Sequence, residues 1–413
     1  MSTSTQPGAP PNHGQQRVRS RVPLIAFFGV LATLAVLTIL ALVLVLGELT
    51  SERGGTTRQA TVAARSSGDP ALRSIVPATP WLKPPANARL KRIGVGSCLD
   101  QSKPQPIWQA IRAANPDLFL MIGDNIYAKD VKSTDARELI EAYAVQARHP
   151  ELAEARAAFP FLAIWDDHDY GLNDAGSEFS QKSRSAEAFR AFWQQPEASP
   201  DGGGVYYSRT FGEPGSRVQV IMLDTRWFRS PLKLRDSTFP HWGKYQPDAT
   251  PDKTMLGARQ WAWLAGELRK PAEIRLLISS VQVLAEGHGF ERWGNLPAER
   301  KRLIDTIRES GAGGVVLLSG DRHAGARYEE TFPRAAGGRQ LLVELTTSSL
   351  NRPYGPSKDA RMPPLASDIF HPENFGIVDI DWQARRLSVT LNGRDGRAVL
   401  ARMIAFDDLA VKN

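Results

Sequence analysis

The stretch Trp165–Asp174 (WDDHDYGLND) places four aspartates and one histidine within ten residues, directly after the apolar run FPFLAI. Adjacent carboxylates repel one another, and burying them without a partner costs several kcal/mol. An acidic surface turn would avoid that cost by leaving the carboxylates in water. A bound cation would avoid it by pairing with them, and the sequence alone leaves both readings open at this single position.

Similar polar clusters follow other short apolar runs along the chain. Gly, Asp and Asn are common in turns for backbone reasons, so each cluster alone is compatible with an ordinary turn. Ligand sites of open α/β sheets lie at the carboxyl ends of the strands, however, and all of these clusters occupy that position. They therefore predict one shared site. The clusters are GSC (96–98), GDNIY (123–127), WDDHD (165–169), DTR (224–226) and SGDRH (319–323).

The side chains in these clusters form a mixed set of candidate metal ligands. A ferric ion favours anionic oxygen and sulfur donors, and binding lowers the pKa of phenol and thiol groups. The remaining carboxylates and an amide suit a second, harder divalent cation. Two cations about 3.5–4 Å apart can act as a clamp for in-line displacement at phosphorus. The candidate ligands are Cys98, Asp124, Tyr127, Asp166 or Asp167, His168, Asn173, Asp321 and His323.

Short apolar runs that alternate with amphipathic segments predict an α/β core, and its C-terminal strands form an antiparallel meander. The predicted helices are Asp135–Arg148, Gly257–Arg269 and Pro297–Arg308. The predicted strands are Arg92–Gly96, Leu118–Ile122, Phe161–Ile164, Val218–Leu223, Ile274–Ser279, Val315–Leu318, Leu341–Leu345, Gly376–Asp381, Leu387–Leu391 and Val399–Ala405.

The N-terminal part differs in composition from the rest. Residues 1–22 are polar and predict a disordered cytoplasmic tail. Residues 23–47 contain a 24-residue uncharged run, Leu24–Gly47, preceded by three arginines, and predict a transmembrane helix with the remaining chain exported. A cleaved signal peptide is the alternative, although its apolar core should be about 7–15 residues long. Residues 48–87 predict a linker, and residues 88–413 a catalytic domain.

The order of the motifs resembles the alkaline phosphatase D family within the calcineurin-like metallophosphatase superfamily. Asp124 and Tyr127 match the family's GD-x-x-Y positions, and Asp167-His168-Asp169 matches Asn-His-Asp/Glu with Asp in place of Asn. Asp321-x-His323 matches His-x-His with Asp in place of the first His, and Cys98 stands where the superfamily usually has Asp-x-His. The run ELTTSSLN (344–351) is also similar to that family, and the resemblance covers roughly residues 89–405.

The resemblance implies a two-sheet β-sandwich core flanked by helices in α/β/β/α layers. It also implies a binuclear centre of Fe³⁺ and Ca²⁺, or another divalent cation, with Asp124 bridging the two ions. Members of the family often carry a separate β-sandwich before the catalytic domain, and we expect this chain to lack it.

The implied reaction is phosphoester hydrolysis, in which the metal ions generate hydroxide from bound water near neutral pH. His168 is the candidate to protonate the leaving oxygen, with Asp169 orienting it. Arg226 is predicted to bind a phosphate oxygen, although a structural salt bridge is an equal alternative. His241, His288 and His371 are expected at the surface or the substrate rim, and the role of Gln282 stays open.

The sequence is compatible with several functions. The substrate is a phosphoester, but the sequence does not distinguish a monoester from a diester. A phospholipase-like phosphodiesterase acting on lipid or wall-polymer esters at the membrane is one alternative, and a membrane-anchored binding protein without turnover is another. The net charge of +7 is compatible with anionic partners, but no nucleic-acid-specific binding is predicted.

Overall fold

The computed structural model describes residues 68–195, 199–200, 202–333, 337–356, 358–359 and 361–410. The predicted tail of residues 1–22 and the predicted transmembrane helix of residues 23–47 lie outside these residues, so both stay predictions. Among the helices that the structure describes, none has the length and apolar character needed to cross a membrane.

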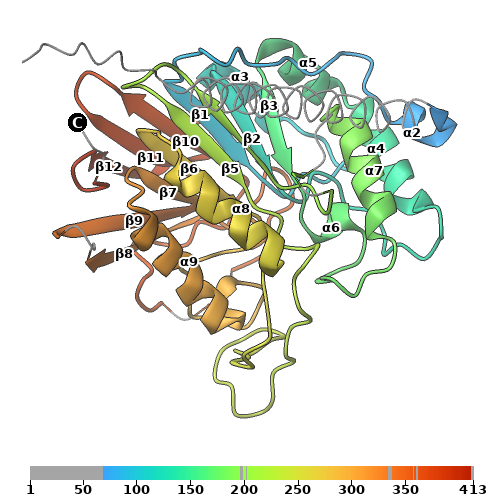
Figure 1. Ribbon diagram of the computed structural model, residues 1–413. Helices are drawn as coiled ribbons and strands as arrows, with labels where there is room; N and C mark the ends of the chain where they lie inside the picture. The colour runs from blue at the N-terminus through green and yellow to red at the C-terminus, as the bar shows by residue number, and fades with distance from the viewer. Residues whose placement is uncertain are drawn as a thin grey trace, which may run out of the picture. The chain divides into compact units, whose positions relative to one another are not determined.

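Two six-stranded mixed sheets form the centre of the fold (Figure 1). The first has the order β12-β11-β10-β1-β2-β3, in which β1, β2 and β3 are parallel and β10, β11 and β12 continue antiparallel from β1. Its strands are β1 (Arg92–Gly96), β2 (Leu118–Ile122), β3 (Phe161–Ile164), β10 (Asn374–Asp381), β11 (Arg386–Gly393) and β12 (Ala398–Ala405).

The second sheet has the order β4-β5-β6-β7-β9-β8. Its central strands β5, β6, β7 and β9 are parallel, and the edge strands β4 and β8 are antiparallel to their neighbours. Its strands are β4 (Tyr207–Phe211), β5 (Val218–Met222), β6 (Ile274–Ser279), β7 (Val315–Ser319), β8 (Ala326–Pro333) and β9 (Arg339–Thr346).

The parallel strands are nearly continuous apolar runs because both of their faces are buried. Alternate residues of β5 to β7 and β9 belong to one buried cluster, which also contains the apolar residues of the first sheet and of the helices packed on it. The opposite residues, such as Ile221, Leu277 and Leu317, pack in a second core with helices α8 (Gly257–Arg269) and α9 (Pro297–Ser310). Figure 1 shows these two helices across that outer face, and α3 (Ile107–Ala114) and α5 (Pro150–Ala158) beside the strands of the first sheet. The layers therefore run helix, sheet, sheet, helix, as the resemblance implied.

The observed helices include all three that the periodicity predicts, with ends shifted by at most two residues. Of the described helices that were not predicted, all except α7 have nine residues or fewer. The helices are α2 (Pro70–Ser74), α3 (Ile107–Ala114), α4 (Arg137–Ala147), α5 (Pro150–Ala158), α6 (Asp167–Tyr170), α7 (Lys182–Trp193), α8 (Gly257–Arg269), α9 (Pro297–Ser310) and the 3₁₀ helix η1 (Trp293–Asn295).

The predicted linker of residues 48–87 is wrong from residue 68 onward. Leu72 and Ile75 are buried at α2, and Trp81 packs into the core of the first sheet. The Trp81 indole N–H also donates a 2.7 Å hydrogen bond to the carbonyl oxygen of Phe192. These isolated apolar residues show no helical or strand periodicity, which is why the sequence suggested a linker.

Candidate metal centre

The predicted ligands lie just beyond the carboxyl ends of parallel strands from both sheets. Cys98 follows β1, Asp124 follows β2, Asp167 follows β3, and Asp321 and His323 follow β7. Backbone hydrogen bonds from Cys98 N to Gly123 O (3.2 Å) and from Leu99 N to Asp124 O (2.8 Å) fasten the first two loops together. The two sheets thus bring four of the five predicted clusters to one place, whereas the DTR cluster (224–226) after β5 is buried and supplies none of the donor groups.

The backbone at this site is strained. A positive φ is uncommon in non-glycine residues, and such strain persists at functional sites when the surrounding structure enforces it. Ten non-glycine residues in the described part have positive φ, and five of them belong to this site. They are Cys98 (58°), Asp124 (52°), Asp174 (54°), Asp321 (66°) and His323 (52°).

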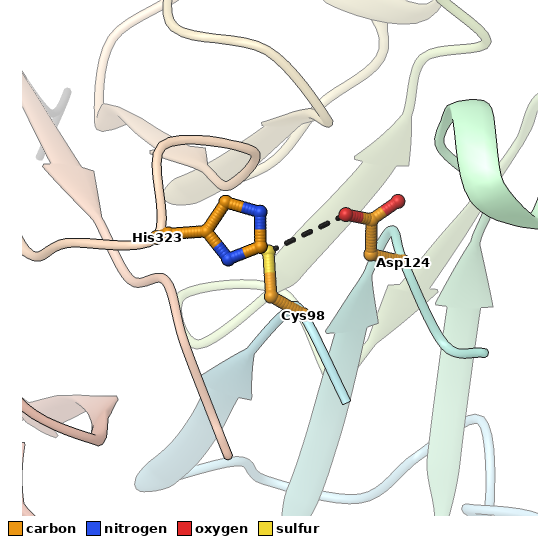
Figure 2. Close-up of side chains that lie close together, drawn as sticks. All are labelled: Cys98, Asp124 and His323. Atoms are coloured by element: carbon orange, nitrogen blue, oxygen red, sulfur yellow. Dashed lines mark hydrogen bonds between the residues drawn. The ribbon is translucent and has the colours of Figure 1, made fainter. Parts of the chain in front are cut away.

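Cys98, Asp124 and His323 form the first group of donors (Figure 2). One ligand atom from each residue lies within 4.8 Å of the others, and the Sγ of Cys98 is 3.6 Å from Oδ2 of Asp124. The hydroxyl of Tyr127 donates a 2.7 Å hydrogen bond to the same Oδ2 and lies 3.5 Å from Nε2 of His323. Three other predicted ligands therefore surround Asp124.

The imidazole of His323 is oriented by its surroundings. Its Nδ1 lies 2.5 Å from the carbonyl oxygen of Arg352, which requires Nδ1 to carry the proton, and its ring stacks on Tyr354 at 3.9 Å. Burial lowers the pKa of His323 to about 3, so the ring is neutral. Its Nε2 lone pair consequently faces Tyr127 and the donor group, as a metal ligand requires.

Asp124, Asp167 and His168 form the second group, so Asp124 belongs to both. The backbone N–H of His168 lies 3.4 Å from Oδ1 of Asp124, and its ring lies 4.3 Å from that of Tyr127. Oδ2 of Asp167 accepts a 2.8 Å hydrogen bond from the backbone N–H of Asp174. A carboxylate shared by two donor groups is the arrangement predicted for the bridge between two ions.

The electrostatics of both groups favour a cation. Burial, followed by repulsion from Cys98 and Asp167, raises the pKa of Asp124 well above its usual value. Burial also raises the pKa of the Cys98 thiol to about 11, and burial and Asp124 raise the pKa of Tyr127. Burial opposes ionisation of Asp167 too, but His168 and Arg226 attract its charge and lower its pKa. The mixture of thiol, phenol, imidazole and carboxylate donors around buried negative charge therefore fits one or more bound metal ions.

Asp321 and Asn173 line the same cavity of about 540 Å³ as Asp124, Asp167 and His168, and Asp321 belongs to none of the compact carboxylate, thiol and imidazole groups of the described residues. A third group joins Asp167 to Asp174 and Glu291. The sequence offered no signal for Glu291, because it lies in a loop rather than directly after a strand.

Arg226 is fully buried and does not lie among the residues that line the cavity. Its Nε donates to Oδ1 of Asp166 (2.6 Å), and its two terminal nitrogens contact Glu291 at 2.8 and 2.7 Å. Ser280 donates to the same Asp166 oxygen at 2.6 Å, and Arg229 contacts Glu291 at 2.8 Å. The prediction that Arg226 binds phosphate is therefore wrong, because its guanidinium is used by two buried carboxylates. Asp167, and not Asp166, is the aspartate that faces the cavity.

Asp169 likewise has a different role from the one predicted. Its Oδ1 accepts hydrogen bonds from Asn125 N (3.0 Å) and Tyr143 OH (3.2 Å), and its Oδ2 accepts one from Asp166 N (3.0 Å). Both oxygens are thus occupied by donors other than the His168 ring. Asp169 joins the loop after β2 to the loop after β3, so the prediction that it orients His168 is wrong.

Two residues outside the motifs belong to a buried polar network. The amide of Gln282 donates to Tyr328 OH (3.1 Å) and Thr346 Oγ1 (2.9 Å), and its oxygen lies 2.9 Å from Nε2 of His288. The expectation of a rim position for His288 is wrong, since only 1% of it is exposed. His371, by contrast, does line the cavity.

The PhoD-like phosphatase family model matches residues 94–391 of this chain. The chain belongs to this family. Alkaline phosphatase D of Bacillus subtilis (strain 168) is 26% identical over 274 residues, which cover 56% of this chain and 46% of that protein. The PhoD-like chain thus spans about half the length of this curated relative. A solved structure described as "Structure of PhoD" aligns with a TM-score of 0.59 and 18% identity over 79% of this chain and 70% of the other, which supports the shared fold.

Proposed function

We propose that this chain is a metal-dependent phosphoester hydrolase with a binuclear centre. The observation that carries the proposal is that Asp124 belongs to two donor groups at the base of one cavity. Membership in the PhoD-like phosphatase family supports the reaction class. A pure binding site would not require a half-buried imidazole, that of His168, to line the cavity beside the bridging carboxylate.

The donor types suggest how two ions would be held. Cys98, Tyr127, His323 and Asp124 supply the sulfur, phenol, imidazole and carboxylate groups that suit Fe³⁺. Asp124 and Asp167 supply hard oxygen donors for Ca²⁺ or another divalent cation. Asn173 and Asp321 line the same cavity and are proposed as additional oxygen ligands. When bound, the ions would lower the pKa of water and stabilise charge on the phosphoryl oxygens.

The residues of the chain contribute proton transfer and positioning. His168 lines the cavity, and we assign it to protonate the leaving oxygen of the ester. Its backbone N–H faces Asp124 and its ring rests against Tyr127, so the imidazole is held beside the donor groups. The strained loops keep these groups in place before substrate arrives, which reduces the reorganisation that the reaction requires.

The location of the enzyme is part of the proposal. The uncharged run from Leu24 to Gly47, preceded by arginines, supports a single-pass membrane anchor with the catalytic part outside the cytoplasm. Fractionation of cells that express the full chain tests this point. Recovery of a soluble form that begins after Gly47 would replace the anchor with a cleaved signal peptide.

The central experiment measures metal content together with hydrolysis of a phosphomonoester and a phosphodiester. We expect iron plus a divalent cation, and a visible charge-transfer band that Tyr127→Phe reduces while iron is retained. Asp124→Ala should lose metal and activity together, whereas Asp395→Ala, in the turn after β11, should lose neither. A colourless, fully active protein containing only zinc would contradict the assigned metals. Metal-loaded protein without activity on either ester would contradict the function.

A further inference from the structure

The cavity above the donor groups is larger than a phosphate group requires. Its volume of about 540 Å³ falls within the range of about 300–1,000 Å³ that is typical of sites for whole organic ligands. Four aromatic side chains other than histidine line it, those of Trp242, Tyr245, Phe290 and Tyr354. The cavity lining therefore combines polar donor groups with aromatic side chains, and the exposed Trp242 lies at its mouth.

A segment between β5 and α8, residues 239–247, forms one side of this mouth, and we call it the mouth strap. Backbone hydrogen bonds join it to the loop that contains Phe290: Gly289 N donates to Trp242 O at 2.8 Å, and Tyr245 N donates to Gly289 O at 2.6 Å. Gly243 has a φ of 141°, and a Cβ there would lie 2.2 Å from the backbone of Gly289. The two segments are thus packed too closely for any side chain at that point.

The mouth strap also contacts the donor groups. Lys244 Nζ and Tyr245 OH each lie 2.8 Å from Oδ2 of Asp174. The backbone N–H of Asp174 in turn donates to Asp167. The mouth strap is consequently joined both to the loop that contains Phe290 and to Asp174, and Figure 1 shows the long loop to which it belongs at the bottom of the view.

Trp242 is the residue that this arrangement presents to the cavity. Its side chain packs edge-to-face on Phe290, with ring centroids 4.7 Å apart, yet 44% of the residue remains exposed. The guanidinium of Arg322 lies 4.5 Å from the centre of the Phe290 ring and supports it. The carbonyl of Trp242, rather than its indole, holds the mouth strap. An exposed indole on a rigid backbone at the mouth of a cavity is therefore available to a ligand.

We propose that Trp242 and Phe290 bind the organic group of the phosphoester and favour a flat aromatic group beside the phosphate. The inference rests on the proposed hydrolase function and assigns part of its substrate specificity. An aromatic pair strengthens binding by up to about tenfold beyond the burial of its area. A phosphoester with an aromatic group thus gains affinity over one with a methyl group at the same phosphorus.

The test compares phenylphosphonate with methylphosphonate, which share the same head group and differ only in the organic substituent. Dissociation constants are measured by calorimetry on the metal-loaded enzyme and on Trp242→Ala, Trp242→Phe and Leu234→Ala. Leu234 is the matched control, because it lies in the same loop, is 64% exposed and does not line the cavity. Hydrolysis of phenyl phosphate and methyl phosphate is followed in parallel.

We expect Trp242→Ala to weaken phenylphosphonate binding about tenfold and methylphosphonate binding less than twofold. Trp242→Phe should recover most of the loss, and Leu234→Ala should change neither constant. If Trp242→Ala weakens the binding of both phosphonates equally, or changes neither dissociation constant, the inference is wrong. This holds even if both phosphate esters are hydrolysed normally. Selective loss of phenylphosphonate binding in a protein that hydrolyses neither ester would support the inference and reject the proposed function.

Discussion

Replacing Arg226 with methionine would separate its observed structural role from the phosphate-binding role that the sequence suggests. Methionine approximates the length of the arginine side chain but removes its charge and all five of its donors. Arg226 is fully buried, and it contacts both Asp166 and Glu291. Without it, Glu291 keeps Arg229, and Asp166 keeps only the hydroxyl of Ser280 and its own loop.

The expected loss in the free energy of unfolding at pH 7 is about 3–5 kcal/mol, the usual effect of removing one partner from a buried ion pair. This loss is a large part of the free energy of unfolding of a typical protein, which is about 5–15 kcal/mol. Burial already raises the pKa of Glu291 to about 7, despite the opposing effect of Arg226. Without Arg226, the pKa values of Asp166 and Glu291 should rise further. As the pH falls from 7 to 5, the folded variant then binds protons that its unfolded form does not bind. The loss in the free energy of unfolding, relative to the unsubstituted protein, should therefore become smaller over this range.

Urea unfolding at pH 7 and at pH 5, followed by tryptophan fluorescence, measures both expectations. Arg397→Met serves as a control, because Arg397 has an 88% exposed side chain and should change stability by less than about 0.5 kcal/mol. If Arg226→Met cannot be purified in folded form, Arg226→Lys retains the charge without the bidentate geometry and should show a smaller loss. A variant with unchanged stability but greatly reduced kcat would refute the structural role.

Three further predictions concern the donor groups and the loop that follows β3. His168→Ala should retain metal but lose about 10²–10⁴-fold in kcat on alkyl esters and less on an activated aryl ester, whereas loss of metal would identify His168 as a ligand. Metal affinity should rise with pH, because the Cys98 thiol has a pKa of about 11 and must lose its proton when it binds the metal. If the thiol is a ligand, Cys98→Ser should make log Kd depend less steeply on pH. Asp169→Ala should lower the free energy of unfolding by about 1–3 kcal/mol for each buried N–H that is left without an acceptor, as measured by urea unfolding. An unchanged urea midpoint would show that Asp169 does not stabilise the two loops that it joins.

The sequence predicted the parallel strands and the place where the site forms, because buried parallel strands are apolar runs and the motifs follow them directly. It did not predict α6 or the edge strand β4, because a four-residue helix and a half-exposed strand leave little periodicity to detect. It also missed Glu291, which reaches the site from a loop after a long connection. Loop residues of this kind are positioned by tertiary contacts, which cannot be predicted from a local sequence pattern.

The run WDDHD shows that a sequence motif can predict which residues lie near a site without predicting what each side chain does there. Its three carboxylates differ little in sequence context, yet Asp167 faces the cavity, Asp166 pairs with Arg226, and Asp169 accepts backbone N–H groups. The short helix that begins at Asp167 turns successive side chains in different directions, and each then meets a different partner. One acidic motif can therefore supply a donor for a cation, an anchor for a buried guanidinium and a brace between two loops. The repulsion among its charges is met by three separate partners rather than by a metal ion alone.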